Sequence, residues 1–425
     1  MKFTRRTALG AMVAGGIATG TLAACGGNGG GGDGGSGGGD VELTVATFNE
    51  FGYETLYEKY MEENPHVTIK AKKAATSDEA RQNLLTGLAA GSGLADIEGV
   101  EVGWWAELSQ YADKFEDLGG EDVESRWLDW KNAAATVDGT LIGYGTDIGP
   151  EAIAYRADLF EKGGLPADRE EVKALLEGDW KTYLEVGRTF TEASGIPFYD
   201  GAGGTYNGMV QQLSNPYEDA DGNPIPLADN TEVKAIYDLL AEYKDISAGL
   251  GQWSEDWVAA FQNDGFATML CPPWMMGPIE GNASGVEGWD IADVFPGGGG
   301  NWGGSYLTVP AQGDNVEEAR KLAAWLTAPE QQIVAFQEVG AFPSQVEALD
   351  ADEVTSQVSE FFNDAPVGEI FSTRATSIET QPFMGPNFFV INTVVADAIT
   401  RWDMEGMDPE ESWQQALVAY DELGL

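Results

Sequence analysis

The chain has 425 residues, of which 43% are hydrophobic and 13 are tryptophan, so it is long enough for two or three lobes with real cores. Its formal net charge of −47 excludes nucleic acid and anionic lipid as partners of the folded part, because both are polyanions. A single histidine, His66, and two cysteines, Cys25 and Cys271, leave little for a His-based triad or a Cys/His metal site.

Residues 1–24 are expected to be an export signal. Arg5 and Arg6 precede an apolar stretch, as in a twin-arginine signal, although Ala8 stands where that motif often has an aromatic residue. The stretch is too short and glycine-rich to be a transmembrane helix. Its end, LAAC, is similar to a bacterial lipobox and predicts cleavage before Cys25 and lipidation of that residue. The alternative is an ordinary cleaved signal with a chance cysteine.

Residues 25–40 are expected to be the lipidated cysteine and a glycine-rich tether, because the composition GGNGGGGDGGSGGGD has no core-forming side chains. The folded part begins at Val41, where strand and helix patterns alternate. That alternation predicts an α/β fold with a parallel sheet. The expected order is a strand at 41–46, a helix at 51–64, a strand at 67–73, a helix with a capping box at Thr76 and Glu79, and a strand at 97–102.

Ligands of parallel α/β sheets lie beyond the carboxyl ends of the strands. Asn49 follows the first strand, and Glu101 with the pair Trp104 and Trp105 follows the third. One of the two tryptophans is expected to pack inward. Asp147 follows a further strand expected at 141–145.

The second half of the chain predicts further α/β elements. The motif DADGN at 219–223 resembles part of a calcium loop but fails the EF-hand spacing, so a hairpin turn is preferred. Trp253 and Trp257 lie four residues apart, and two prolines precede Trp274. Helices are expected at 104–115, 158–162, 180–191, 231–244, 315–326, 329–339 and 407–423, and extended segments at 151–156, 195–199, 266–270 and 305–309.

The stretch FPGGGGNWGGSYLTVP at 295–310 combines six glycines with one tryptophan ahead of a strand. Glycine permits backbone conformations that other residues avoid, so the stretch is typical of a hinge at the rim of a cleft. Trp302 is followed by Gly303, Gly304 and Ser305. A surface loop with Trp302 tucked into the core is the alternative.

No nucleophile elbow, zincin motif or metal-ligand spacing is present, so an enzyme, a metal and a cofactor are not expected. Tryptophans at strand ends and loops, with Asn49, Glu101 and Asp147 nearby, suit a sugar instead. Indole rings offer an apolar face for sugar C–H groups, and amides and carboxylates bind hydroxyls.

At this point the chain resembles bacterial extracellular solute-binding proteins of carbohydrate ABC importers, a family that includes maltose-binding proteins. The resemblance covers residues 41–425 and follows the lipobox in a specific order. The matching stretches are ADI at 95–97, YGTD at 144–147, IAYRADLF at 153–160, GGSY at 303–306 and KLAAWLTAPEQ at 321–331.

The resemblance implies two α/β lobes with the ligand between them, joined by three crossings near 149–150, 302–305 and 341–344. Lobe 1 would comprise 41–149 and 305–342, and lobe 2 would comprise 150–304 and 343–425. It also implies that closure of the lobes creates the form that a membrane permease recognises. By this resemblance the residues Asp147, Trp274 and Trp302 match positions that touch sugar, with Asn49, Glu101, Trp104, Trp253, Gly304 and Ser305 as further candidates.

The function so implied is capture of a di- or oligosaccharide by an exported monomer that is lipid-anchored to the outer face of the cytoplasmic membrane. Its partners would be the sugar and the permease, with no nucleic acid, no cofactor and no membrane contact beyond the lipid. The alternatives are a binding protein for another small solute, such as a polyol or peptide, and a cell-surface polysaccharide-binding protein.

Overall fold

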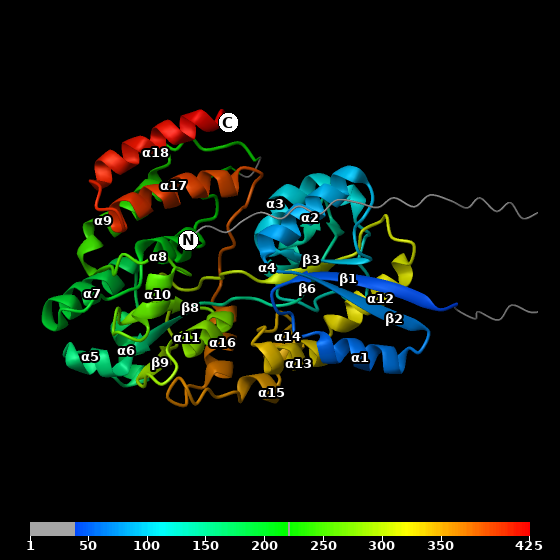
Figure 1. The fold of residues 1–425 in the computed structure, drawn as a ribbon, viewed down its shortest axis with the longest axis horizontal. Coiled ribbons are helices and arrows are strands. Elements are labelled where there is room, and N and C mark those ends of the chain that lie inside the picture. Colours follow the sequence, from blue (N-terminus) through cyan, green and yellow to red (C-terminus); the bar gives the residue numbers. More distant parts are fainter. Residues whose placement is uncertain (1–38, 220–221) are drawn as a thin grey trace, which may run out of the picture. The chain divides into compact units, whose positions relative to one another are not determined.

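The structure, a computed structural model, describes residues 39–219 and 222–425. The predictions for Arg5, Arg6, Cys25 and most of the tether lie outside the described residues. Residues 40–425 form one compact unit with a five-stranded, a three-stranded and a two-stranded sheet, and Figure 1 shows helices around the two larger sheets. We call the five-stranded sheet with its helices the first lobe, and the three-stranded sheet with its helices the second lobe.

The sheet of the first lobe has the order β2-β1-β3-β10-β6. Strand β1 pairs in parallel with β2 and with β3, as the alternation of strands and helices predicted. Strand β10 pairs antiparallel with both β3 and β6, so the sheet is mixed, and the predicted parallel pairing holds for its first three strands. The strands are β1 (Val41–Phe48), β2 (Val67–Ala74), β3 (Ile97–Glu101), β6 (Tyr144–Gly145) and β10 (Ser305–Thr308), with a separate hairpin of β4 (Thr136–Val137) and β5 (Thr140–Leu141).

Helices pack against this sheet over one hydrophobic core that includes Leu43, Val45, Ile97 and Leu307. The first helix begins at Glu54, later than the expected residue 51, and the second begins after Thr76, as the sequence predicted. Thr76 caps the second by accepting a hydrogen bond from the Glu79 backbone N–H at 3.2 Å, as a capping box requires. The helices are α1 (Glu54–Glu63), α2 (Ser77–Ala90), η1 (Val102–Trp104), α3 (Trp105–Leu108), η2 (Ser109–Lys114), α4 (Asp129–Ala134), α12 (Val316–Leu326) and α13 (Pro329–Val339).

The second lobe is built on three antiparallel strands in the order β8-β7-β9, with bounds β7 (Ala152–Arg156), β8 (Thr268–Cys271) and β9 (Trp289–Ala292). Side chains of β7 alternate between two cores, because successive residues of a strand point to opposite faces. Ile153 and Tyr155 belong to one core, and Ala152 and Ala154 belong to the other. Both faces of the sheet are therefore covered.

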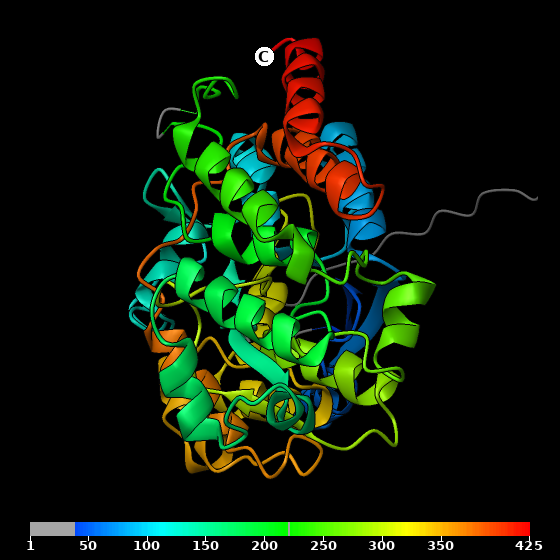
Figure 2. The same cartoon turned by 90° about the vertical axis from the view of Figure 1, so that its left-hand side faces the viewer.

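Figure 1 and Figure 2 show the long helices α17 and α18 side by side in this lobe. The helix α13 of the first lobe reaches toward the second, because Ile333 and Phe336 pack against a core of that lobe. The helices of the second lobe are α5 (Ala157–Lys162), α6 (Arg169–Leu176), α7 (Trp180–Ser194), α8 (Ala202–Val210), α9 (Thr231–Glu242), η3 (Lys244–Ile246), α10 (Glu255–Ala260), η4 (Pro273–Met275), α11 (Met276–Asn282), α14 (Val346–Leu349), α15 (Asp352–Thr355), α16 (Val367–Thr376), α17 (Phe388–Asp403) and α18 (Pro409–Leu423).

Three predicted elements differ from the structure. The helix expected at 104–115 is divided into α3 and two 3₁₀ turns, with a non-helical backbone at Tyr111. The strand expected at 141–145 is divided because Leu141 pairs with β4 and Tyr144 pairs with β10. The segment 195–199 forms only isolated bridges at Tyr199, since Pro197 has no N–H for a ladder.

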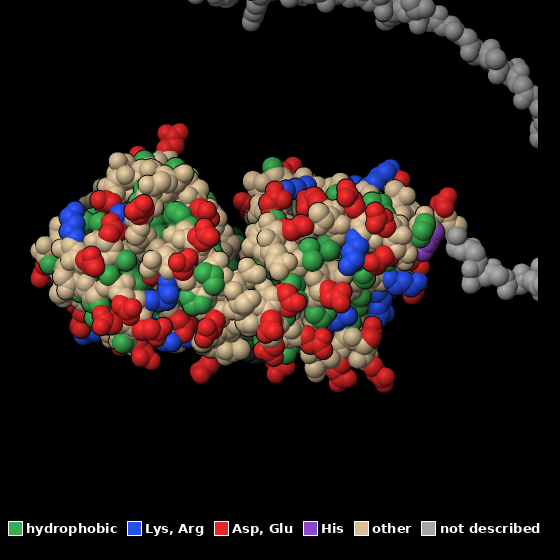
Figure 3. Space-filling model, turned by 90° about the horizontal axis from the view of Figure 1, so that it is seen from below, with side chains coloured by type: hydrophobic (Ala, Val, Ile, Leu, Met, Phe, Trp, Pro, Cys, Tyr) green, Lys and Arg blue, Asp and Glu red, His purple; other side chains and the backbone are tan. Residues whose placement is uncertain are grey.

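Acidic side chains are spread over the surface, and Figure 3 shows them on one face with few lysines and arginines between them. No helix within 39–219 and 222–425 is long and apolar enough to cross a membrane. The same residues contain no group of His, Cys, Asp and Glu side chains that could hold a metal ion. Cys271 is a buried free thiol, and burial raises its pKa, which disfavours the thiolate.

Candidate functional site

Three segments far apart in the sequence lie beside one another between the two sheets. The Ile148 N–H donates to the Phe342 carbonyl over 2.9 Å, and the Trp302 N–H donates to the Gly149 carbonyl over 2.8 Å. Pro150 also forms an isolated bridge with Asn301. These contacts place the predicted crossings at 149–150, 302–305 and 341–344 side by side.

The close approach of these segments depends on glycine at position 149. A Cβ there would lie 1.9 Å from the carbonyl oxygen of Trp302, which is far inside van der Waals contact. At Gly304 the φ of 103° favours glycine, and a Cβ would lie 2.7 Å from the carbonyl oxygen of Asp147. The glycines therefore allow the chain to pass close to its neighbours at the crossings.

Asp147 joins two of the crossings. Its Oδ1 accepts hydrogen bonds from the Ser305 backbone N–H at 2.9 Å and from the Thr146 hydroxyl at 2.8 Å. Ser305 also pairs with Glu101, at the end of β3. We call Glu101, Asp147, Gly304 and Ser305 the crossing cluster. All four were predicted from the sequence as candidate ligand-binding residues.

A lysine that the sequence did not indicate lies next to this cluster. The Lys131 ammonium donates to the Asp147 carbonyl oxygen over 2.8 Å and lies 3.7 Å from the centre of the Tyr306 ring. Burial lowers the pKa of Lys131 to about 7, while the charges of Asp147 and Glu101 oppose that shift. Lys131 stands in a short helix of mixed polarity, so no sequence pattern marks it.

Burial also raises the pKa of Glu101 to about 7, although a hydrogen bond from the Gly103 N–H and the charge of Lys131 oppose the rise. The Glu101 Oε2 accepts that hydrogen bond at 2.8 Å. The site therefore combines the carboxyl groups of Glu101 and Asp147 with the amine of Lys131. With a pKa of about 7, this amine is only partly protonated near neutral pH. Such groups bind hydroxyls well, because a carboxylate accepts hydrogen bonds and an ammonium donates them.

Three tryptophans extend from the crossings along the second lobe, and we call them the tryptophan row: Trp302, Trp274 and Trp253. The Trp274 indole N–H donates to the Trp302 carbonyl over 2.9 Å. Ring centroids of Trp274 and Trp302 are 4.9 Å apart in an edge-to-face arrangement. Those of Trp274 and Trp253 are 6.3 Å apart, with planes only 21° from parallel.

Exposure increases along the row. Trp302 and Trp274 are half-buried, whereas Trp253 is 58% exposed. Most of the large apolar side chains in the described residues are buried, so a tryptophan this exposed leaves a ring face available for another molecule. The row was predicted as ligand-binding, and the structure brings its three members together beside the crossing cluster.

One predicted residue, Trp104, lies apart from these groups. Trp104 is 4% exposed, and its ring lies 5.1 Å from that of Phe48, inside the core of the first lobe. Trp105 is buried as well, so both tryptophans pack inward where only one was expected to. Asn49 is exposed after β1 in a left-handed conformation.

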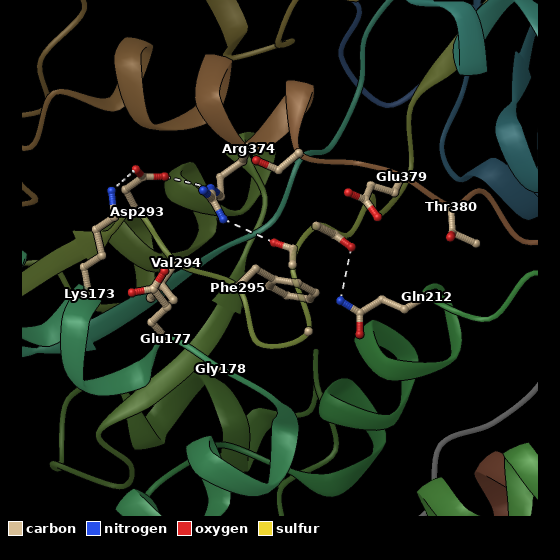
Figure 4. A pocket seen from close by; sticks show the side chains of 14 residues that line it. Lys173, Glu177, Gly178, Gln212, Asp293, Val294, Phe295, Arg374, Glu379 and Thr380 are labelled. Atoms are coloured by element: carbon tan, nitrogen blue, oxygen red, sulfur yellow. Dashed lines mark hydrogen bonds and ion pairs between the residues drawn. The ribbon is translucent and has the colours of Figure 1, made fainter.

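A polar cavity of about 530 Å³ lies in the second lobe beside the glycine stretch, and Figure 4 shows the side chains that line it. Asp293 lies between two cations, 2.6 Å from the Lys173 ammonium and 2.7 Å from Nε of Arg374. Gln212 donates to the Pro296 and Gly299 carbonyls at 2.9 Å and 3.1 Å. Most of these polar groups thus hold the loop that leads to Trp302.

This chain is similar to a known protein family, to individual binding proteins and to solved structures. The sequence profile of the family described as "Bacterial extracellular solute-binding protein" matches residues 55–362. An arabinooligosaccharide-binding protein of Bacillus subtilis (strain 168) is 26% identical over 315 residues, which is 69% of this chain and 70% of that protein.

Solved structures share the fold. One described as "Extracellular solute-binding protein family 1" is 49% identical, with a TM-score of 0.85 over 90% of this chain and 99% of that chain. Another, an ABC transporter associated binding protein from B. animalis subsp. lactis Bl-04 in complex with β-1,6-galactobiose, is 20% identical, with a TM-score of 0.69 over 90% and 96% of the two chains.

Proposed function

The chain belongs to the family of bacterial extracellular solute-binding proteins, and from this premise we propose that it captures a di- or oligosaccharide and delivers it to the permease of an ABC importer. The observation that most favours a sugar as the ligand is the tryptophan row, which runs from the crossing cluster to the exposed ring of Trp253. A row of indole faces beside carboxylates suits a ligand with apolar faces and many hydroxyls.

The energies available suffice for a useful site. A hydrogen bond to a charged group contributes roughly 1.5–3 kcal/mol. Two or three such bonds from Asp147 and Glu101, with stacking on Trp274 and Trp302, reach a micromolar dissociation constant, which corresponds to about −8 kcal/mol. Three tryptophans in a row favour two or more sugar units over a single one.

The ligand would bind between the lobes and hold them closed. A hinge at the crossings, with lobe boundaries at 149/150, 304/305 and 342/343, is supported by the membership of β10 in the first sheet. It is also supported by the glycines at 149 and 304, which let the three segments run together. A ligand with contacts on both lobes shifts the population toward the closed form.

The names of similar proteins support a sugar ligand. The relative from Bacillus subtilis is called an arabinooligosaccharide-binding protein, and the structure from B. animalis contains β-1,6-galactobiose. Export followed by lipidation of Cys25 would keep the protein, as a monomer, beside its permease at the outer face of the cytoplasmic membrane. Capture without chemistry is the expected activity, so the sugar would leave unchanged and no cofactor would be needed.

Calorimetric titration of residues 40–425 tests the proposal. The panel comprises maltose, cellobiose, xylobiose, chitobiose, arabinobiose and their longer homologues, with a polyol and a dipeptide as the alternative solutes. The proposal expects one sugar per chain at micromolar affinity or tighter, with the intact sugar recovered. Binding of only the polyol or dipeptide would retain the transport role and reject the sugar. Binding of long polymers without compaction in solution scattering would favour a cell-surface polysaccharide-binding protein.

A further inference from the structure

The most exposed member of the tryptophan row has a strained backbone. Trp253 has a φ of 70°, in the left-handed region that a bulky residue rarely occupies. Such a conformation persists only where neighbouring contacts hold it. The residues on either side of Trp253 supply those contacts.

One buried carboxylate holds the segment on both sides of Trp253. The Oδ2 of Asp200 accepts hydrogen bonds from Nε2 of Gln252 at 3.0 Å and from the indole N–H of Trp257 at 2.9 Å. Asp200 is 2% exposed. Its two donors stand one residue before Trp253 and four residues after it, so a single oxygen fixes both flanks of the exposed ring.

The backbone next to Asp200 is fitted to the same segment. The Leu250 N–H donates to the Asp200 carbonyl over 3.1 Å. A Cβ at Gly201 would lie 2.3 Å from the Leu250 carbonyl oxygen, and a Cβ at Gly204 would lie 2.5 Å from Nε2 of Gln252. The absence of side chains at these two glycines therefore lets the segment 250–253 lie directly on the start of α8.

From these contacts we infer that Asp200, with Gly201 and Gly204, positions the Trp253 ring as the outer end of the sugar site. Asp200 does not touch the sugar itself and acts through Trp253. The inference rests on the proposed function, because it assigns Asp200 a part in selecting chain length. Sugars long enough to reach Trp253 bind more tightly because they also stack on its ring. Shorter sugars contact only Trp274 and Trp302.

Burial raises the pKa of Asp200 to about 6, while the hydrogen bonds from Gln252 and Trp257 oppose the rise. The group is therefore mainly a carboxylate at neutral pH, and a carboxylate oxygen is a strong acceptor for both N–H groups. An asparagine in its place keeps one oxygen that both groups can share, whereas an alanine keeps none.

The test measures the affinity of residues 40–425 for a disaccharide and for the tetrasaccharide of the same series. Asp200→Ala is expected to weaken tetrasaccharide binding about 10-fold and disaccharide binding less than about 2-fold, and Asp200→Asn to restore most of the loss. Gly204→Ala, which displaces Gln252 by another route, is expected to give the same selectivity. Asp179→Ala removes a carboxylate that caps α7 elsewhere in the lobe and serves as the control.

A double-mutant cycle separates positioning from general loss of structure. In a Trp253→Ala background, Asp200→Ala should cause no further loss of tetrasaccharide affinity. Equal losses with and without Trp253, or unchanged affinity in both the Asp200→Ala and Gly204→Ala variants, would overturn the inference.

If the wild-type chain binds no sugar, the proposed function fails and the inference is judged by acrylamide quenching of Trp253 fluorescence. The Trp253-dependent part of the signal is obtained by comparison with Trp253→Phe. A changed quenching constant for that part in the Asp200→Ala variant supports the positioning role, and an unchanged constant rejects it.

Discussion

The backbone N–H of Ser305 donates to Oδ1 of Asp147 over 2.9 Å, across 158 residues of sequence. This bond fixes the start of β10 against the residue that follows β6 and so draws two crossings together. Lys131 donates to the carbonyl of the same aspartate. Asp147 is thus part of both the proposed hinge and the proposed sugar site.

Replacing Asp147 with asparagine separates these two roles. The amide oxygen can still accept from the Ser305 N–H, so the melting temperature should change little. The negative charge is lost, and a hydrogen bond to a charged group is worth about 1 kcal/mol more than one to a neutral group. Sugar affinity measured by titration should fall roughly 5-fold. Unchanged affinity in a folded Asp147→Asn variant would remove this residue from the site.

Trp274 lies in the middle of the tryptophan row, so its removal should affect every sugar that binds. Trp274→Ala is expected to weaken binding at least about 10-fold for disaccharides and longer chains, since a buried aromatic contact contributes on the order of 1.5–3 kcal/mol. Trp325→Ala is the matched control, because Trp325 lies on α12 against Tyr60, away from the row. Equal effects of the two variants would mean that the loss is not specific to the site.

Gly149 is predicted to be intolerant of any side chain. Gly149→Ala places a methyl group against the Trp302 carbonyl oxygen, so the crossings must separate or the fold must lose stability. The melting temperature should fall by several degrees, or sugar affinity should fall if the crossings move apart. Gly277→Ala provides the control in α11, where a Cβ meets no atom within 4 Å. A Gly149→Ala chain with wild-type stability and affinity would contradict the described packing.

Glu151 gives a pH prediction. It is fully buried beside the first crossing, neither of its oxygens has a hydrogen-bond partner in the described residues, and burial raises its pKa to about 8 from 4.5. Between those values the folded chain keeps a proton that the unfolded chain has lost, so this group makes stability fall as pH rises. Above about pH 8 both the folded and the unfolded chain have lost this proton, so the stability of the fold stays at its lower value and no longer changes with pH through Glu151.

Glu151→Gln is neutral at every pH and should remove that contribution. The melting temperature of the variant relative to wild type should therefore rise between about pH 5 and about pH 8.5. Calorimetric scans of both chains at the two pH values measure the difference. A constant difference across this range would show that the buried carboxyl titrates normally.

The sequence was sufficient to predict β1, β3 and β10, which border the site, because their periodic patterns are local. It also indicated Asp147 after a strand, Trp274 after two prolines, and Trp302 in a glycine stretch ahead of a strand. It could not distinguish Trp253 from Trp104, since exposure depends on what packs from elsewhere in the chain. The first is exposed on a loop held by Asp200, and the second is covered by Phe48.

Tertiary contacts explain the remaining differences between the structure and the predictions from the sequence. Lys131 approaches Asp147 only because α4 packs beside β6, a contact between elements that no spacing in the sequence reveals. The antiparallel direction of β10 follows from the return of the chain from the second lobe, which the resemblance implied but local patterns do not. The segment 195–199 has a strand-like composition, but Pro197 and its neighbours prevent a ladder.

The central claim is that a sugar binds along the tryptophan row next to Asp147. A crystal structure of residues 40–425 with the tightest sugar from the titration tests it most directly. The account predicts sugar rings stacked on Trp274 and Trp302, with a hydroxyl bonded to the Asp147 carboxylate. Sugar found only in the polar cavity beside Arg374, or away from all three tryptophans, would contradict it.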